Sequence, residues 1–416
     1  MTEETLLRVE NLYKHFPIFK GFIQRQVERF AARLERARAV ARGQGLGALL
    51  IGVGADLRYL TGHIVLPLER LTMLVIPADG PATLVTPRLE AVAARQAPAA
   101  LAGLFDILPW DETDDAAAMV AALVRAGTAG TDTRTGARAP TVAAPTVAVS
   151  ERAWAMHVLA LQRALPGAPM GLATAVLREL RMAKDPAEVD RLLVAALAAD
   201  RVVDQIAAGR LVGRTEADVS REVRDRLVAE GHELAEFAIV GSGPNSASPH
   251  HEASERVIAA GEPIVLDIGG AYDGYCSDTT RTLWVTGGDP AKGPTAEFLA
   301  LYAVLQRAQA EATAAVRPGI ACETIDAVAR DIITAGGHGP HFIHRVGHGI
   351  GLETHEEPYL VAGNGELLRP GYAFSVEPGI YLEGRYGARI EDIVVCGEDG
   401  PIVLNRSSRD LRVVPG

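Results

Sequence analysis

Four carboxylates lie in stretches that are expected to form strands, and two of them, Asp267 and Glu377, interrupt apolar runs, where an acidic side chain is unfavourable unless its charge is compensated. Asp267 lies in PIVLDIGG, and Asp278 lies eleven residues later in YCSDTTRT. Glu377 interrupts YAFSVEPGIYL, and Glu391 lies in GARIEDIVV. An unpaired buried carboxylate is strongly destabilising or takes up a proton. If strands bring these four side chains together, the site needs cations.

The first two carboxylates are spaced as on the two arms of a hairpin. The residues AYDG between them predict a turn, and a hairpin would place Asp267 and Asp278 side by side on one face. The alternative is that one aspartate caps the turn while water solvates the other at a strand edge. Arg389 and Glu391, two residues apart, share a face on a strand, whereas Asp392 is expected to point to the outer face.

The stretch HRVGHGIGLETHEEP (344–358) combines three histidines with three glycines. His344 and His348 are four residues apart, as on one helix face, but the interleaved glycines make a regular helix costly. From spacing alone, these histidines are metal ligands, catalytic groups or polar residues of a tight glycine loop. His348 is the simplest imidazole partner for the carboxylates, because glycine on both sides lets the backbone come close to the site.

The charge and chemical type of these side chains predict the metals. Four inward carboxylates carry a charge of about −4, which two divalent cations balance. Oxygen-rich ligation with one imidazole suits Mn²⁺, Co²⁺ or Fe²⁺, and it also accommodates Zn²⁺. Two such ions about 3.5–4 Å apart, bridged by carboxylates and a water, form the two-metal arrangement of many hydrolases. The residues therefore predict a dinuclear hydrolytic centre.

The elements that carry these residues are expected to form two domains, because 416 residues is long for one. Short apolar strands within 46–87, flanked by helical patterns near 28–44 and 89–99, predict a small α/β domain over 28–175. Residues 111–150 are rich in Ala, Thr and Gly. We interpret that stretch as poorly packed surface with one or two weak strands.

The second domain is expected over 176–416, with an α+β fold. Asp185 as N-cap, followed by Pro186, predicts the start of its first long helix. Helix pairs alternate with strand pairs, which indicates an antiparallel sheet with helices on one face. The helices are expected at 186–208, 215–231, 295–316 and 321–336, and the strands at 235–241, 262–270, 275–286, 372–382 and 387–396.

Residues 1–27 fit neither domain. The segment LLRVENLYKHFPIFKGFIQRQV resembles the opening segment of oligopeptide-importer ABC ATPases, yet no G-x-x-x-x-G-K-[ST] motif occurs anywhere in the chain. One interpretation is a vestigial or mis-started extension. The other is a fusion remnant, which would point toward peptide metabolism. We expect the extension to be non-catalytic.

The overall composition limits the partners and the compartment. A formal net charge of −11 argues against nucleic acid or an anionic membrane as a main partner. No apolar run is long enough for a membrane span, and MTEETLLRVE lacks the features of a signal peptide. Three scattered cysteines form neither a CxxC pair nor a disulfide framework. We therefore expect a soluble cytoplasmic protein.

In order and spacing, five residues resemble the ligand set of the metallopeptidases with the pita-bread fold: Asp267, Asp278, His348, Glu377 and Glu391. This family comprises methionyl aminopeptidases, Xaa-Pro aminopeptidases and Xaa-Pro dipeptidases (prolidases), with creatinase as a relative. The strings DIGG…YCSDTTRT, HRVGHGIGLETHEEP, SVEPGIY and RIEDIVV are typical of its prolidase and aminopeptidase P branch. The resemblance implies a C-terminal pita-bread domain with a curved antiparallel sheet, a creatinase-like N-terminal α/β domain, and a homodimer.

The resemblance also implies the metal-binding roles of the five residues. Asp267 would bind one metal ion, and Asp278 would bridge both. His348 and Glu377 would serve the second ion, and Glu391 would bridge. The implied activity is hydrolysis of the Xaa-Pro bond at the N-terminus of di- or oligopeptides by a metal-bridging hydroxide, with Mn²⁺ as the first choice of metal.

Three further histidines receive roles from the resemblance. His250 follows a proline in SASPHHEAS and matches the family's first catalytic histidine, in preference to its neighbour His251. His355 would contact the scissile peptide, and His344 would line the site or order the glycine loop. Glu377 would shuttle a proton to the leaving amine.

The length of the substrate stays open. Some archaeal prolidases carry a carboxylate-binding arginine at the position that Tyr359 occupies in this chain. Arg345, Arg369 or Arg385 could replace that arginine, so a dipeptidase and an aminopeptidase are both compatible with the sequence. Arg389 is expected to support the bridging glutamate and to border the substrate.

Two other functions remain as alternatives. One is a creatinase-like hydrolase of a small non-peptide C–N bond, against which the intact ligand set argues. The other is a non-catalytic binding module, which would lose ligands and usually carries long appended tails. Away from the centre, we expect His251 and His338 to be exposed loop histidines and Cys276 to be a small packed residue.

Overall fold

The computed structural model describes residues 12–128 and 144–416, so the part of the expected extension that precedes residue 12 lies outside the described residues. The chain divides into two compact units, which meet in sequence between Leu180 and Arg181. None of the described helices is long and apolar enough to cross a membrane.

Unit 1 is an α/β unit around a six-stranded sheet of order β4-β3-β2-β1-β5-β6. Its central strands β1 and β2 are buried along their whole length, which explains their uninterrupted apolar sequences. Its elements are α1 (Leu12–Gly43), β1 (Ala48–Gly52), α2 (Ala55–Thr61), β2 (Met73–Pro77), β3 (Thr83–Pro87), α3 (Ala91–Ala94), α4 (Pro98–Leu101), β4 (Asp106–Trp110), α5 (Ala116–Thr128), β5 (Val147–Val149), α6 (Ala155–Ala164), β6 (Met170–Leu172) and α7 (Thr174–Met182), which ends just inside unit 2.

Three expectations for unit 1 need correction. The helix expected from about residue 28 begins at Leu12, so a single helix runs through the expected end of the extension. The helix expected at 89–99 is two short helices, because Pro98 starts α4. In the stretch 111–150, expected to be poorly packed, α5 instead places Val120 and Val124 in the core of this unit. The short strand β5 agrees with the weak strand expected there, and residues 129–143 of the stretch lie outside the described residues.

Unit 2 combines helices with three arrangements of strands, which are antiparallel except for β17, which pairs with β9 in parallel. The helix expected after Asp185 is confirmed: the Asp185 carboxylate accepts from the backbone of Glu188 and the Glu188 carboxylate from that of Asp185, which is a capping box. Its elements are α8 (Pro186–Ala207), α9 (Glu216–Ala229), β7 (Leu234–Ser242), η1 (Gly243–Ala247), β8 (Glu262–Tyr272), β9 (Tyr275–Val285), η2 (Pro290–Lys292), α10 (Ala296–Ala314), α11 (Cys322–Ala335), η3 (Gly339–His341), β10 (Gly347–Gly349), β11 (Glu356–Leu360), β12 (Ala373–Val376), β13 (Gly379–Leu382), β14 (Tyr386–Arg389), β15 (Asp392–Cys396), β16 (Pro401–Val403) and β17 (Arg412–Val414).

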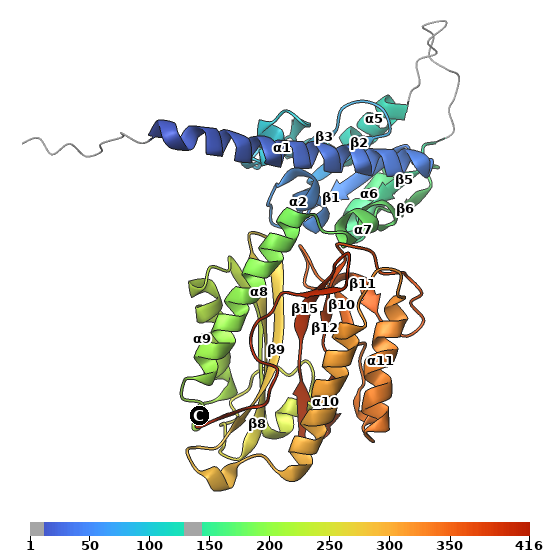
Figure 1. Cartoon of the computed structure of the whole chain (residues 1–416). Coiled ribbons are helices and arrows are strands. Elements are labelled where there is room, and N and C mark those ends of the chain that lie inside the picture. The colour runs from blue at the N-terminus through green and yellow to red at the C-terminus, as the bar shows by residue number, and fades with distance from the viewer. Residues whose placement is uncertain (1–11, 129–143) are drawn as a thin grey trace, which may run out of the picture. The chain divides into compact units, whose positions relative to one another are not determined.

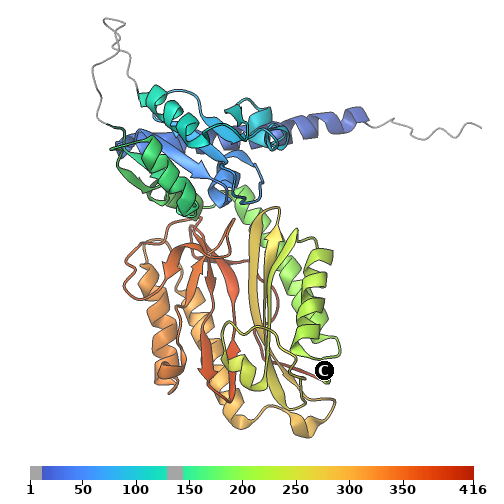
Figure 2. The same cartoon turned by 180° about the vertical axis from the view of Figure 1, so that it is seen from behind.

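The strands of unit 2 lie between two pairs of helices. Helices α8 and α9 contact the sheet β17-β9-β8-β7, and α10 and α11 contact strands of the sheet β11-β10-β12-β15-β16 and of the β13–β14 pair (Figures 1 and 2). The inner faces of the two sheets are therefore turned away from the helices. The expected α+β architecture, with helices that cover an antiparallel sheet, is confirmed.

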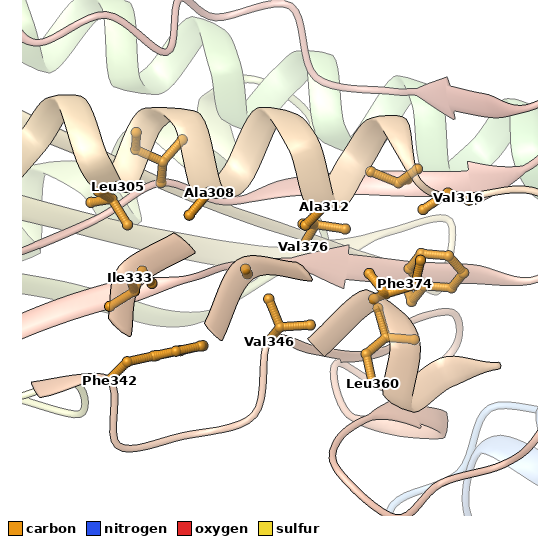
Figure 3. Close-up of a cluster of buried hydrophobic side chains, with 14 of the residues drawn as sticks. Leu305, Ala308, Ala312, Val316, Ile333, Phe342, Val346, Leu360, Phe374 and Val376 are labelled. Atoms are coloured by element: carbon orange, nitrogen blue, oxygen red, sulfur yellow. The ribbon is translucent and has the colours of Figure 1, made fainter. Parts of the chain in front are cut away.

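Helical and strand periodicity place the apolar core on the helix side of β12. Leu305, Ala308 and Ala312 recur at intervals of three and four residues on α10 and meet Phe374 and Val376 of β12 (Figure 3). Because side chains alternate along a strand, the residues between and after those two point to the other face. That alternation directs Glu377, the next acidic residue, away from the core.

Two expected strands are each broken in two. The expected strand 372–382 forms β12 and β13, and the expected strand 387–396 forms β14 and β15. In both cases the first and second parts pair with different partners, since β12 pairs with β15 while β13 pairs with β14. The first break lies at Glu377 and Pro378, where proline offers no N–H to continue the ladder.

Candidate metal centre and active site

The β8–β9 hairpin brings Asp267 and Asp278 onto one face, as the sequence predicts. Asp267 pairs directly with Thr280, and Asp278 lies two residues before Thr280 on the same strand. Leu266 and Ile268, on either side of Asp267, pack into the core beneath α8 and α9. The alternation of the strand therefore turns both aspartates to the face opposite the helices.

Glu377 and Glu391 lie at the breaks in the two expected strands. Glu377 follows Val376 at the end of β12, and Glu391 precedes Asp392, which pairs with Val376. The two glutamates thus leave the same end of one antiparallel pair. The hydroxyl of Thr280 donates to Glu391 Oε2 at 2.6 Å, which connects this pair to the β8–β9 hairpin.

His348, in β10, adds an imidazole to the four carboxylates. Its Nε2 lies 3.2 Å from Glu377 Oε1 and 3.5 Å from Asp278 Oδ2. Its Nδ1 lies 3.1 Å from the carbonyl oxygen of Gly349, so the proton belongs on Nδ1 and Nε2 presents a lone pair. A lone pair that faces two carboxylate oxygens fits a cation between them.

Burial makes the ionised carboxylates unfavourable without compensating charge. Burial and the neighbouring carboxylates raise the pKa of Asp278 and of Glu391 well above the usual range. Asp267 Oδ1 is buried and has no hydrogen-bond partner. Ligand atoms of these residues gather within 4.8 Å of one another in three overlapping groups, one of which also includes His355. The donor set fits two divalent cations.

Arg389 is the buried cation beside this cluster. Its guanidinium is bound by Asp267 Oδ2, and it donates to the hydroxyl of Tyr381 at 2.9 Å and to the carbonyl oxygen of Pro249 at 3.3 Å. Its Nε donates to the hydroxyl of Thr280 at 3.1 Å. Arg389 therefore connects the hairpin, the glutamate strands and the loop that precedes His250.

The cluster opens into a cavity of about 1030 Å³, which His250, His344 and His355 also line. The ring of His355 lies edge-on to the ring of His348, with centroids 4.1 Å apart. Burial, together with nearby His348, lowers the pKa of His355 to about 4. Its imidazole is therefore neutral at neutral pH and can donate an N–H to a bound carbonyl oxygen.

His344 is held deeper in the wall of this cavity. Its Nε2 lies 2.9 Å from the hydroxyl of Tyr381, and its Nδ1 lies 2.7 Å from the carbonyl oxygen of Arg345. Burial lowers the pKa of His344. His344 thus lines the cavity and contacts the glycine-rich loop through the carbonyl oxygen of Arg345.

The structure separates the three arginines that could bind a substrate carboxylate. Arg345 lines the cavity, and its guanidinium lies over the ring of Tyr359, 4.2 Å from the centroid. Arg369 and Arg385 instead form exposed ion pairs with glutamates. Tyr359 is not among the described residues that line the cavity, and its ring lies beneath the Arg345 guanidinium.

His251 was expected to be an exposed loop histidine, but the structure shows it bound to a buried carboxylate. Its Nε2 lies 2.7 Å from Glu216 Oε2, and Glu216 is fully buried at the start of α9. Glu216 also accepts hydrogen bonds from Ser242 and Ser254. The expectation failed because a partner on another helix cannot be inferred from the local sequence. His250, in contrast, is exposed to the cavity.

Three other expectations can be compared with the structure. Asp392 was expected on the outer face, but it is fully buried, with its carboxylate 2.7 Å from Arg281 Nη2. The positive charge of Arg281, on another strand, compensates the buried carboxylate, and the local strand pattern around Asp392 could not reveal this partner. His338 is half-buried rather than exposed. Cys276 is packed in a hydrophobic cluster, as expected.

Other residues that line the cavity were not predicted from the sequence. Glu236 and Phe237 of β7 and Thr354 of the glycine-rich stretch belong to its wall. A glutamate near the start of a strand is normally solvated, so its type and position gave no signal. The fold is needed to bring β7 beside the loop that carries Thr354.

Comparisons with known proteins agree with this organisation. Residues 190–398 match the model of metallopeptidase family M24, and residues 33–183 match that of the creatinase/prolidase N-terminal domain. The chain is 45% identical to a probable dipeptidase PepE of Mycobacterium tuberculosis over 389 residues, which is 93% of this chain and 97% of the relative. It is 33% identical to the Xaa-Pro dipeptidase of Lactobacillus helveticus, over 86% of this chain and 92% of the relative.

A solved structure is similar over nearly the whole length. The crystal structure of dipeptidase PepE from Mycobacterium ulcerans has a TM-score of 0.84 and 44% sequence identity, and the match covers 93% of this chain and 98% of that chain. Such agreement over both units extends the similarity beyond the motifs to the complete fold.

Proposed function

Since this chain belongs to metallopeptidase family M24, we propose that it hydrolyses the Xaa-Pro bond at the N-terminus of di- or oligopeptides. The observation that carries the proposal is the convergence of four carboxylates and one imidazole at a cavity large enough for a short peptide. The name of the Lactobacillus helveticus relative, Xaa-Pro dipeptidase, supports the same substrate class.

The five residues expected from the sequence would hold two divalent cations. Mn²⁺ is the first candidate, because oxygen donors outnumber the single imidazole. When bound, the two ions lower the pKa of a water molecule and polarise the scissile carbonyl. The unpartnered Asp267 Oδ1 and the lone pair of His348 Nε2 supply the donor atoms that such ions need.

The remaining residues would position the peptide and move its protons. His250 and His355 line the cavity and can donate hydrogen bonds to the oxygen on which negative charge develops. Glu377 can pass a proton to the leaving proline nitrogen, because its carboxylate lies at the cavity wall beside His348. Arg389 holds Asp267 and the Pro249 carbonyl in place and would thereby fix the edge of the site.

The position of Arg345 favours a dipeptide as the preferred substrate. Among the three candidate arginines, Arg345 alone lines the cavity, and Tyr359 supports its guanidinium from below. A guanidinium binds a carboxylate through paired hydrogen bonds. In an Xaa-Pro dipeptide the carboxyl group of proline is free to pair with the Arg345 guanidinium, whereas in a longer peptide that group is part of the next peptide bond.

The compartment and the assembly complete the proposal. Three buried free cysteines support a reducing cytoplasm. The family resemblance supports a homodimer, which size-exclusion chromatography with light scattering would test.

A peptide-length series tests the proposed function. Ala-Pro, Ala-Pro-Ala and longer peptides are assayed with Mn²⁺, and we expect release of the N-terminal residue, fastest from the dipeptide. Asp278→Asn should bind less metal and lose activity. Asp273→Asn is the matched control, because it removes an exposed carboxylate from the turn of the same hairpin and asparagine accepts its left-handed backbone. No cleavage at any metal tested, or full activity of Asp278→Asn, would refute the proposal.

A further inference from the structure

One carboxylate in the wall of the cavity has no part in the proposed metal centre. Glu236 lines the cavity together with the five expected ligands. It belongs to none of the three groups of described residues that could hold a metal ion. A carboxylate that faces a substrate cavity and binds no metal is free to recognise charge on the substrate.

The backbone of β7 aims this side chain into the cavity. The pairing of β7 with β8 shifts between Ala235 and Phe237, so Glu236 is the extra residue of a β-bulge. On a regular strand, Glu236 and Phe237 would point to opposite faces. Both line the cavity, because a bulge re-aims the side chain that it inserts.

The immediate contacts of Glu236 orient its carboxylate without neutralising it. The hydroxyl of Thr354 donates to Oε2, and the thiol of Cys276 lies 3.8 Å from Oε1. Within the described part of the chain, no lysine, arginine or histidine forms an ion pair with Glu236. The carboxylate is exposed to solvent, so a cationic ligand can reach it.

We propose that Glu236 selects substrates with a basic side chain on the residue before proline. The inference rests on the proposed function and specifies its substrate class. Lysine and arginine combine an aliphatic stem with a terminal charge. Phe237 and Ile239 offer apolar surface to the stem on the same wall of the cavity, and Glu236 accepts hydrogen bonds from the terminal charge.

The apolar neighbours distinguish a side chain from the α-ammonium group of the substrate. An α-ammonium group has no stem that would use Phe237 and Ile239, and every peptide substrate carries one. Recognition of the α-ammonium would therefore make Glu236 important for all substrates alike. Recognition of a basic side chain makes Glu236 important for some substrates only.

The test compares two dipeptides whose N-terminal residues have the same stem and differ in charge. kcat/KM is measured for Lys-Pro and for norleucyl-Pro with the metal-loaded wild type, with Glu236→Gln and with the control Glu233→Gln, which removes an exposed carboxylate outside the cavity. We expect the wild type and the control to prefer Lys-Pro. Glu236→Gln should lower the ratio of Lys-Pro to norleucyl-Pro by about fivefold, the upper range for a partly exposed ion pair.

Charge reversal gives an independent readout. Glu236→Lys should favour Glu-Pro over Gln-Pro, whereas the wild type should disfavour it. If Glu236→Gln leaves the ratio of Lys-Pro to norleucyl-Pro unchanged, whether kcat/KM stays the same or falls equally for both dipeptides, the inference is overturned. Cleavage of the dipeptides would still uphold the proposed function. Failure of the wild type to cleave any Xaa-Pro peptide would overturn both.

Discussion

The buried carboxylate of Glu216 should stabilise unit 2 in a pH-dependent way. Burial would raise its pKa, but hydrogen bonds from Ser242, Ser254 and His251 outweigh burial and lower the pKa from 4.5 to about 2. At about 1.36 kcal/mol per unit of pKa, ionised Glu216 contributes about 3 kcal/mol to the free energy of unfolding at neutral pH. Glu216→Gln removes that contribution and retains the size of the side chain.

The sign of the pH dependence follows from the direction of the shift. Because the folded pKa is lower than the unfolded one, the stabilisation is complete above the unfolded pKa of 4.5 and is lost as the pH falls toward about 2. The destabilisation by Glu216→Gln should therefore be largest at pH 7 and smaller by about 1–2 kcal/mol near pH 3.5. Titrating groups that do not contact Glu216 cancel in the difference between the two proteins, whereas His251 contributes through its contact with Glu216.

Tryptophan fluorescence can report on unit 2 alone. The chain has three tryptophans, and Trp284, buried in β9, is the one in unit 2. Urea unfolding is followed in a Trp110→Phe/Trp154→Phe background, with and without Glu216→Gln, at both pH values. Asp218→Asn, half-exposed in the first turn of the same helix, is the control and should change the free energy of unfolding far less than Glu216→Gln does. An equal effect of Glu216→Gln at both pH values would refute the reasoning.

Three further perturbations probe the elements around the cavity. Arg281→Met should lower the free energy of unfolding by about 2–4 kcal/mol, because Asp392 Oδ1 and the carbonyl oxygens of Glu391 and Ser407 lose this donor while Arg409 still pairs with Asp392. A loss below about 1 kcal/mol in urea unfolding would contradict this. Gly347→Ala should lower the free energy of unfolding by about 1–3 kcal/mol, because its Cβ would lie 2.0 Å from a carbonyl oxygen of β12. The control Gly365→Ala, whose Cβ would have no atom within 4 Å, should have little effect in the same urea unfolding. His250→Ala should lower kcat for Xaa-Pro dipeptides about 10²-fold with unchanged metal content, and a change in KM alone would argue against its role.

The metal-site residues could be located from the sequence because two of them are locally anomalous. Asp267 and Glu377 interrupt apolar strands, and that conflict between residue type and strand pattern is visible without a structure. The structure brings these residues together with Asp278, His348 and Glu391. The turn in AYDG likewise follows from local chemistry, since Asp273 and Gly274 both adopt positive φ.

Residues that depend on distant partners could not be located in this way. Asp392 is buried because Arg281 of another strand meets it, and His251 is bound because Glu216 begins a helix elsewhere in the chain. Glu236 reaches the cavity through a bulge, and a bulge in β7 has no signature in the residue types around it. In each case the deciding contact joins segments that only tertiary structure brings together.

The broken strands show why the centre needs irregular backbone. If 372–382 were one strand, its pairing with a continuous 387–396 would hold Glu377 and Glu391 in a ladder with alternating faces. The break at Pro378 ends one antiparallel pair and starts another, so both glutamates leave the ladder at the same place. Backbone N–H groups at the break then find other partners, and that of Glu391 donates to the carbonyl oxygen of Thr280 at 3.1 Å. The interruption that defeats the strand prediction is therefore what directs two carboxylates toward the hairpin that carries the aspartates.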